Sequence, residues 1–184
     1  MHTDNQLRVI YYTHPACTDS WAMREAWKQF TDEFGKLFKL QICMTNTPEY
    51  AEEKKGRSSG QNAALAVKAV SLQSAQASGI YLDALRDASI NQHLDISKLD
   101  TLVEIAKRVS RINSGMFEMN RFGRDLGSHF SRKALHHDQQ KAVINRIDTC
   151  PTISMTVAGK GVKISGNTSY SNLVKTISRL VPIL

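Results

Sequence analysis

The sequence predicts an α/β fold in which a β-α-β unit opens the chain, a β-β-α unit closes it, and a helical segment lies between them. Three observations lead to this expectation. Two strand-like runs flank a helical pattern before residue 45, apolar residues then recur at helical spacing as far as Ile144, and two alternating runs meet at a glycine-containing turn. At 184 residues the chain is long enough to bury a full core.

The opening unit is predicted from its residue types and their spacing. Leu7–Tyr12 is rich in β-branched and aromatic residues, which favours a buried strand. Apolar residues then follow a helical period from Cys17 until Gly35, where we expect the helix to end. Phe38–Met44 alternates as a second strand. The short loops favour a parallel pair of strands with a right-handed crossover.

The middle of the chain is expected to be helical. A polar loop at 45–61 marks its boundary, since it contains proline, glycines and serines. The expected segments are a helix from Ala63 to near Gly79, a stripe through Leu85, a helix behind the capping box Ser97-x-x-Asp100, a short helix over Met116–Phe122 and a long one from Arg124 to Ile144.

The closing unit returns to strand character. Thr152–Val157 alternates, Ala158–Gly161 has turn composition, and Val162–Ile164 is its partner, so we expect an antiparallel hairpin. A final amphipathic helix extends to Val181.

Cys17 is the residue that points most directly to chemistry. It lies where the first strand gives way to a helix, and a helix N-terminus stabilises the reactive thiolate. Ser20 stands where a dithiol site has its second cysteine, and we expect its hydroxyl or amide to hydrogen-bond the thiolate. The negative charge of Asp19 opposes the thiolate, whereas a protonated His14 would offset that charge.

Two motifs, in this order and at this separation, resemble the DsbA-like branch of the thioredoxin superfamily. The motifs are His14-Pro15-Ala16-Cys17-Thr18-Asp19-Ser20-Trp21 after an aromatic strand, and Cys150-Pro151-Thr152 opening the third strand. The chain looks most like the cytosolic members, which include FrnE-type oxidoreductases and Clp-protease adaptors. The resemblance implies a thioredoxin-like domain at 7–44 and 130–184, with a helical insertion domain at 60–129.

The resemblance also implies roles for individual residues. Cys17 and Ser20 become the catalytic pair, and Cys150 becomes a candidate resolving or second thiol. Pro151 becomes a cis-proline facing Cys17, and the backbone before a cis-proline is free to pair with an extended peptide. The substrate-binding residues would be His14, Trp21, Pro151 and Thr152.

Several functions are compatible with a Cys-x-x-Ser site. We expect an enzyme, a DsbA-like thiol–disulfide oxidoreductase in which Cys17 works as a monothiol on a protein or peptide substrate. Because Ser20 cannot resolve a mixed disulfide, either glutathione as co-substrate or Cys150 must do so. The alternatives are a non-catalytic adaptor on a thioredoxin scaffold and a kappa-class glutathione-transferase-like protein. No other cofactor is expected.

Composition narrows the partners. The net charge is +7, and the stretch from Ile105 to Arg146 contains nine Lys or Arg but only three Asp or Glu. This stretch would suit an anionic partner, but a solvated helical surface is the simpler interpretation. Nucleic acid is not expected, since no aromatics interleave with the arginines. No membrane partner is expected either, because no apolar run approaches a membrane span.

The remaining signals concern compartment and metals. The polar N-terminus lacks a signal-peptide pattern, and three cysteines cannot all pair, so a cytoplasmic, reduced protein is expected. Cys43 is expected to pack in the core. His129, His136 and His137 lack metal-ligand spacing, and no metal site is predicted.

Overall fold

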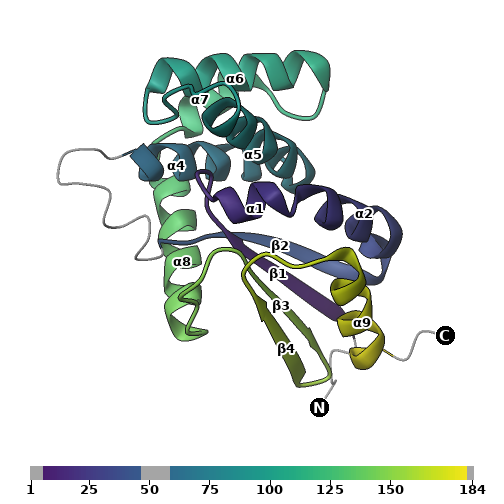
Figure 1. The fold of residues 1–184 in the computed structure, drawn as a ribbon. Coiled ribbons are helices and arrows are strands. Elements are labelled where there is room, and N and C mark those ends of the chain that lie inside the picture. The colour runs from purple at the N-terminus through teal and green to yellow at the C-terminus, as the bar shows by residue number, and fades with distance from the viewer. Residues whose placement is uncertain (1–5, 47–58, 182–184) are drawn as a thin grey trace.

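A four-stranded sheet forms the centre of the part of the chain outside the helical insertion, in the order β2-β1-β3-β4 (Figure 1). β1 (Leu7–Thr13) pairs in parallel with β2 (Phe38–Met44). On its other side β1 pairs antiparallel with β3 (Thr152–Val157), which forms a hairpin with β4 (Lys160–Ser165). The predicted parallel pair and the predicted hairpin are both confirmed.

The computed structural model describes residues 6–46 and 59–181, so most of the polar loop predicted at 45–61 lies outside the described residues. Helices cover both faces of the sheet. One face carries α1 (Thr18–Ala22), α2 (Arg24–Phe34), the 3-10 turn η1 (Gly35–Leu37) and α9 (Tyr170–Leu180), and the other carries α8 (His129–Ile144).

The first strand connects these two faces because successive side chains of a strand point in opposite directions. Tyr11 lies in the core under α2 and α9, where it stacks on Trp27 with ring centroids 4.6 Å apart. Tyr12 points to the opposite face and packs with Cys43 and Ala142 of α8. Cys43 is therefore a packing residue, as expected.

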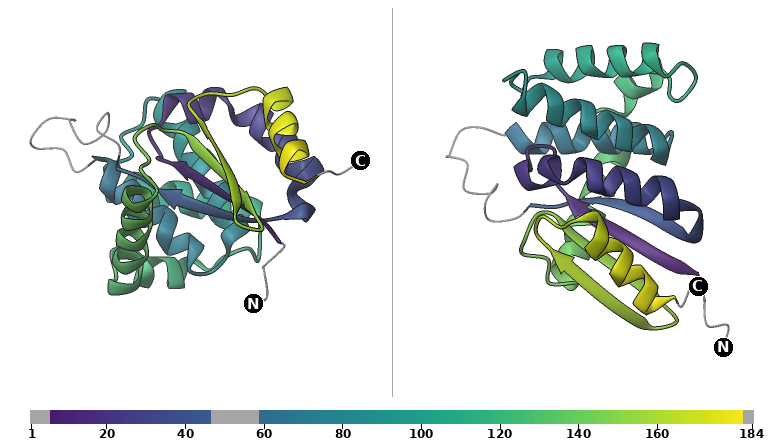
Figure 2. Two further views of the ribbon diagram at one scale, coloured as in Figure 1. Left: turned by 90° about the horizontal axis from the view of Figure 1, so that it is seen from below. Right: turned by 45° about the vertical axis from the view of Figure 1, so that its right-hand side comes forward.

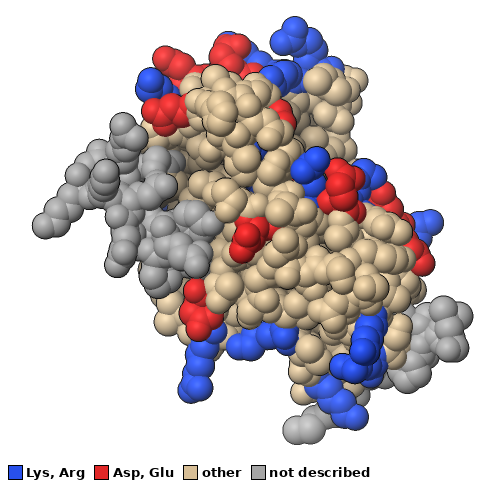
Figure 3. All heavy atoms as spheres, viewed as in Figure 1, with Lys and Arg blue, Asp and Glu red and all other residues tan. Residues whose placement is uncertain are grey.

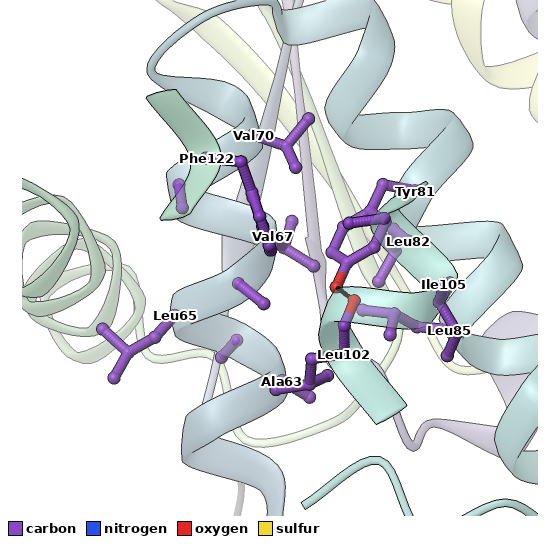
Figure 4. Close-up of a cluster of buried hydrophobic side chains, with 14 of the residues drawn as sticks. Ala63, Leu65, Val67, Val70, Tyr81, Leu82, Leu85, Leu102, Ile105 and Phe122 are labelled. Atoms are coloured by element: carbon purple, nitrogen blue, oxygen red, sulfur yellow. Dashed lines mark hydrogen bonds between the residues drawn. The ribbon is translucent and has the colours of Figure 1, made fainter. Parts of the chain in front are cut away.

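The helical insertion consists of α4 (Ser59–Ser71), α5 (Ala75–Ile90), α6 (Leu99–Ile112) and α7 (Met119–Asp125). Figures 1 and 2 show these helices stacked at one end of the molecule, with α6 and the β3–β4 hairpin at opposite ends. Their apolar faces meet in a separate core, shown in Figure 4. Within it the Tyr81 hydroxyl donates to the Leu102 carbonyl at 2.9 Å.

The prediction of one helix from Ala63 to Gly79 is wrong, because the segment forms two helices: α4 ends at Ser71, and α5 begins at Ala75. Ser74 caps α5, its hydroxyl accepting the Ala77 N–H at 3.1 Å. Gly79 then lies inside α5, where a Cβ would sit 3.6 Å from Ile42. The N-cap at Ser74 therefore starts a second helix, although apolar residues recur at helical spacing across the junction.

Three other helix starts also differ from expectation. Ser97 does not cap α6, since its hydroxyl bonds Asp95 instead and Lys98 is the N-cap. The short helix runs over Met119–Asp125, later than predicted. The long helix begins only after Ser128, whose hydroxyl accepts the Ser131 N–H. In each case a local side-chain bond or a loop displaced the boundary by a few residues.

A buried ion pair joins the insertion to the sheet. Asp138 of α8 accepts from Lys68 of α4 at 2.7 Å and from the backbone N–H of Met44 at 3.0 Å. The Lys68 and Asp138 side chains are 10% and 3% exposed. The end of β2 is thus held between two helices.

The basic stretch from Ile105 to Arg146 is spread over three helices. It is divided among α6, α7 and α8, which Figure 1 places from the far end of the molecule to the side of the sheet. Figure 3 shows acidic and basic side chains mixed at the end that carries α6. Lys107 pairs with Glu104 at 2.7 Å, and Arg121 pairs with Asp125 at 3.4 Å. These features fit a solvated helical surface.

Candidate functional site

Cys17 occupies the N-cap of α1, as the sequence predicts. Its backbone is extended (φ −74°, ψ 108°), and its Sγ accepts the Ser20 N–H at 3.3 Å. The expected single helix from Cys17 to Gly35 is interrupted at Met23, so α1 itself has only five residues. A helix this short has a weak macrodipole, which leaves the amide of Ser20 as the local donor to the sulfur.

Ser20 and Thr13 link Cys17 to the cis-proline loop. The Ser20 and Thr13 hydroxyls lie 2.8 Å apart, and Ser20 Oγ is 3.9 Å from the Sγ of Cys150. Cys150 Sγ is also 4.0 Å from Thr13 Oγ1. The structure therefore brings Cys17, Ser20 and Cys150 together, although they lie at opposite ends of the chain.

Cys150 and Cys17 share Ser20 as a neighbour, whose N–H donates to Cys17 Sγ and whose hydroxyl lies 3.9 Å from Cys150 Sγ. The pKa of Cys150 is raised far above its ordinary value by a hydrogen bond to Cys17, by burial and by the charge of Cys17. Cys150 is therefore the thiol that keeps its proton when a thiolate forms beside it. Neither Cys17 nor Cys150 forms a disulfide in the structure.

The Cys150–Pro151 peptide bond is cis and opens β3 beside the site. Pro151 accepts the Gly166 N–H at 2.7 Å through its carbonyl. The Thr152 hydroxyl donates to the Thr149 carbonyl at 2.7 Å and so holds the loop in place.

His14 differs from the expectation that it provides a positive charge. The ring is buried, and burial, together with the charge of Arg86, lowers its pKa to about 4. A hydrogen bond with the backbone of Gly60 opposes this shift only in part. Nδ1 accepts the Ala16 N–H at 3.2 Å, so the imidazole is neutral near pH 7 and helps to shape the turn before Cys17.

Trp21 lies at the edge of the site and is only partly buried. The guanidinium of Arg24 stacks over its ring, 4.1 Å from the ring centre. It makes none of the contacts that link Thr13, Ser20 and the two cysteines.

Arg86 is a site residue that sequence reasoning missed. It reaches the site from α5, is 2% exposed, and donates from Nη2 to Thr13 Oγ1. Its Nη1 pairs with Asp83 Oδ1 at 3.1 Å. The signal in the sequence was an arginine on the apolar face of a helix, four residues after Leu82.

Both thiols of the pair are closed off from solvent. Cys17 is 0% exposed and Cys150 is 2% exposed. A substrate sulfur therefore reaches Cys17 only when the surrounding segment opens locally. Cys43 stands apart, since burial and the charge of Asp138 raise the pKa of its thiol to about 12.

The described residues contain neither a clustered set of metal ligands nor a helix that could span a membrane. Across 6–46 and 59–181, no group of three or more His, Cys, Asp or Glu is arranged to hold a metal ion. In the same ranges, every helix is too short or too polar to cross a bilayer.

Comparison with known proteins gives a consistent result. A sequence model described as thioredoxin matches residues 11–175. The ClpXP adapter protein SpxH of Bacillus licheniformis is 24% identical over 92% of this chain, which spans 65% of that protein's length. A crystal structure from Nitrosomonas europaea superposes with a TM-score of 0.79 at 14% identity, covering 95% of this chain and 97% of that one. DsbA2 of Pseudomonas aeruginosa gives 0.70 at 16% identity, covering 98% and 92%.

Proposed function

Because the chain belongs to the thioredoxin family, we propose that it is a thiol–disulfide oxidoreductase with Cys17 as nucleophile and Cys150 as second thiol. The observation that carries the proposal is that Ser20 joins the two thiols: its N–H donates to Cys17 Sγ at 3.3 Å, and its hydroxyl lies 3.9 Å from Cys150 Sγ. Ser20 excludes resolution within the Cys-x-x-Ser motif itself. Cys150 supplies the missing sulfur from the cis-proline loop.

The exchange balances with these two thiols alone. The Cys17 thiolate attacks one sulfur of a substrate disulfide, forming a mixed disulfide and releasing the first substrate thiolate, which takes up a proton. Cys150 then loses its proton and attacks Cys17 Sγ, which forms a Cys17–Cys150 disulfide and releases the second substrate thiol. The substrate gains two electrons and the protein loses two. A low-molecular-weight thiol such as glutathione returns the protein to its reduced state.

The other residues of the site have supporting roles in this proposal. Thr13 and Ser20 hold the two sulfurs together, and the backbone before Pro151 pairs with an extended protein or peptide substrate. The partner is accordingly a protein or peptide disulfide. Local opening around Cys17 precedes each encounter, because the sulfur is buried.

The test is an insulin-reduction assay with glutathione as reductant, on the wild type, Cys17→Ala, Cys150→Ala and Cys43→Ala. Loss of turnover is expected for Cys17→Ala. For Cys150→Ala, a mixed disulfide on Cys17 is expected to accumulate when glutathione is left out, because glutathione would otherwise resolve it. Cys43→Ala is the matched control, a buried cysteine outside the site, and should keep wild-type turnover. Turnover that survives Cys17→Ala would contradict the proposal.

A second candidate is an adaptor for a ClpXP protease. It is favoured by the SpxH relative and by the complete burial of Cys17. In this case purified ClpXP binds the chain, and binding is unchanged by Cys17→Ala while insulin reduction is negligible in the wild type. Failure of the wild-type chain to bind ClpXP would remove this candidate.

A further inference from the structure

We propose that Arg86 is a positioning residue that fixes Thr13 and stabilises the negative charge that thiol exchange creates on the Cys17–Cys150 pair. The inference rests on the proposed function in one respect, namely that this pair is the reacting one. It assigns to the helical insertion a direct part in the chemistry of the thioredoxin-like domain. In this proposal Arg86 of α5 supplies the positive charge near the thiolate that a protonated His14 would have supplied.

The contacts place the guanidinium close to both sulfurs. Arg86 Nη2 bonds Thr13 Oγ1, and this oxygen lies 4.0 Å from Cys150 Sγ. Adding a normal hydrogen-bond length places the charge within about 7 Å of that sulfur. Cys17 Sγ accepts the N–H of Ser20, and the Ser20 hydroxyl is 2.8 Å from Thr13 Oγ1, so Cys17 lies in the same field.

The environment of Arg86 is not that of an ordinary structural ion pair. The arginine side chain is 2% exposed, whereas its partner Asp83 is 58% exposed. Water therefore screens the carboxylate more than the guanidinium, and the interior is left with a net positive potential. The Nε of Arg86 is buried and has no hydrogen-bond partner among the described residues.

A buried arginine at this position would destabilise the folded state if it served packing alone. A buried charge with an unsatisfied N–H destabilises the folded state relative to an apolar residue of similar size. An apolar side chain would fit the face that Leu82 and Leu85 share with Arg86. We therefore attribute the buried charge of Arg86 to its position beside the thiols of Cys17 and Cys150.

The other charged and titratable groups around Arg86 do not supply this charge. His14 from β1's loop is neutral near pH 7, and Tyr11 from β1 has a raised pKa because it is buried. On α2, Arg24 and Glu25 pair with each other at 3.2 Å, with 41% and 79% exposed side chains.

The test measures the ultraviolet absorbance of the thiolate against pH in a Cys43→Ala background, which removes the third thiol. Arg86→Met should move the first ionisation of the pair up by about one to two pH units, as expected for a unit charge about 7–10 Å away at an effective dielectric constant of about 20. Arg86→Lys, which keeps the charge, should recover part of the shift. Asp83→Asn removes the screening carboxylate and should move the ionisation in the opposite direction, to lower pH.

The opposite signs separate electrostatics from a loss of structure. An unchanged titration in a folded Arg86→Met protein overturns the inference, and so does an upward shift or no shift in Asp83→Asn. Asp83 is largely exposed, so its variant keeps the test valid even if Arg86→Met does not fold. The measurement needs no disulfide substrate. If the titration shifts occur but the protein does not reduce insulin, the inference about Arg86 is supported and the proposed function is rejected. If the protein reduces insulin but the shifts are absent, the proposed function is supported and the inference about Arg86 is rejected.

Discussion

The buried imidazole of His14 makes the stability of the fold depend on pH in a predictable way. The ring is 2% exposed and is held by the N–H of Ala16 and by the backbone of Gly60. Lowering the pH forces a proton onto a ring whose charged form is disfavoured by burial and by Arg86. Acidification is therefore a perturbation aimed at the turn that carries Cys17.

The magnitude follows from the two pKa values. His14 titrates at about 4 in the folded protein and at 6.5 in an unfolded chain. Between these values the unfolded state binds more protons, so stability is fully present above pH 6.5 and is lost as the pH falls toward 4. The difference corresponds to about 3 kcal/mol of unfolding free energy. This is a large part of the 5–15 kcal/mol typical of a domain.

The assay compares urea unfolding of the wild type and His14→Asn from about pH 7.5 to pH 4.5. Asparagine at position 14 still accepts the Ala16 N–H but does not titrate in this range. The difference in unfolding free energy between the two proteins should change by about 2–3 kcal/mol across the range. A difference that stays flat would refute the reasoning, because carboxylates titrate alike in both proteins.

The remaining predictions concern stability and use the same urea assay. Gly60→Ala should cost about 1–3 kcal/mol, because a Cβ would lie 2.6 Å from the His14 ring, whereas Gly123→Ala, with no atom within 4 Å, should be neutral or stabilising. Equal effects of the two substitutions would contradict the tight contact. Asp138→Ala should cost about 3–5 kcal/mol by leaving the buried Lys68 unpaired, and adding Lys68→Met should recover part of the loss. A double variant no more stable than the single one would count against this ion pair.

The fold was predictable because it depends on periodicity and on short-range signals. The parallel pair of Leu7–Thr13 with Phe38–Met44 and the closing hairpin follow from alternation and loop length. The helix boundaries were less predictable, since they depend on individual caps. Ser74, which begins a new helix as the N-cap of α5, is one of three serines within the stretch predicted as a single helix.

The site was predictable in part. The position of Cys17 at a helix N-cap follows from the junction of strand and helix. The charge state of His14 did not, because burial is set by the tertiary contact with Gly60 and by Arg86. Arg86 itself lies on a helix of the insertion, and only the packing of α5 against α1 and β2 brings it to Thr13. Local patterns carry no information on such contacts.

The central claim is that Cys150 completes the reaction that Cys17 begins. The most direct measurement is mass-spectrometric peptide mapping of the native protein after reaction with an excess of a peptide disulfide and quenching with acid. The account predicts a peptide pair cross-linked between Cys17 and Cys150, with Cys43 still reduced. A stable mixed disulfide on Cys17 with Cys150 left as a free thiol, or both thiols left reduced, would contradict it.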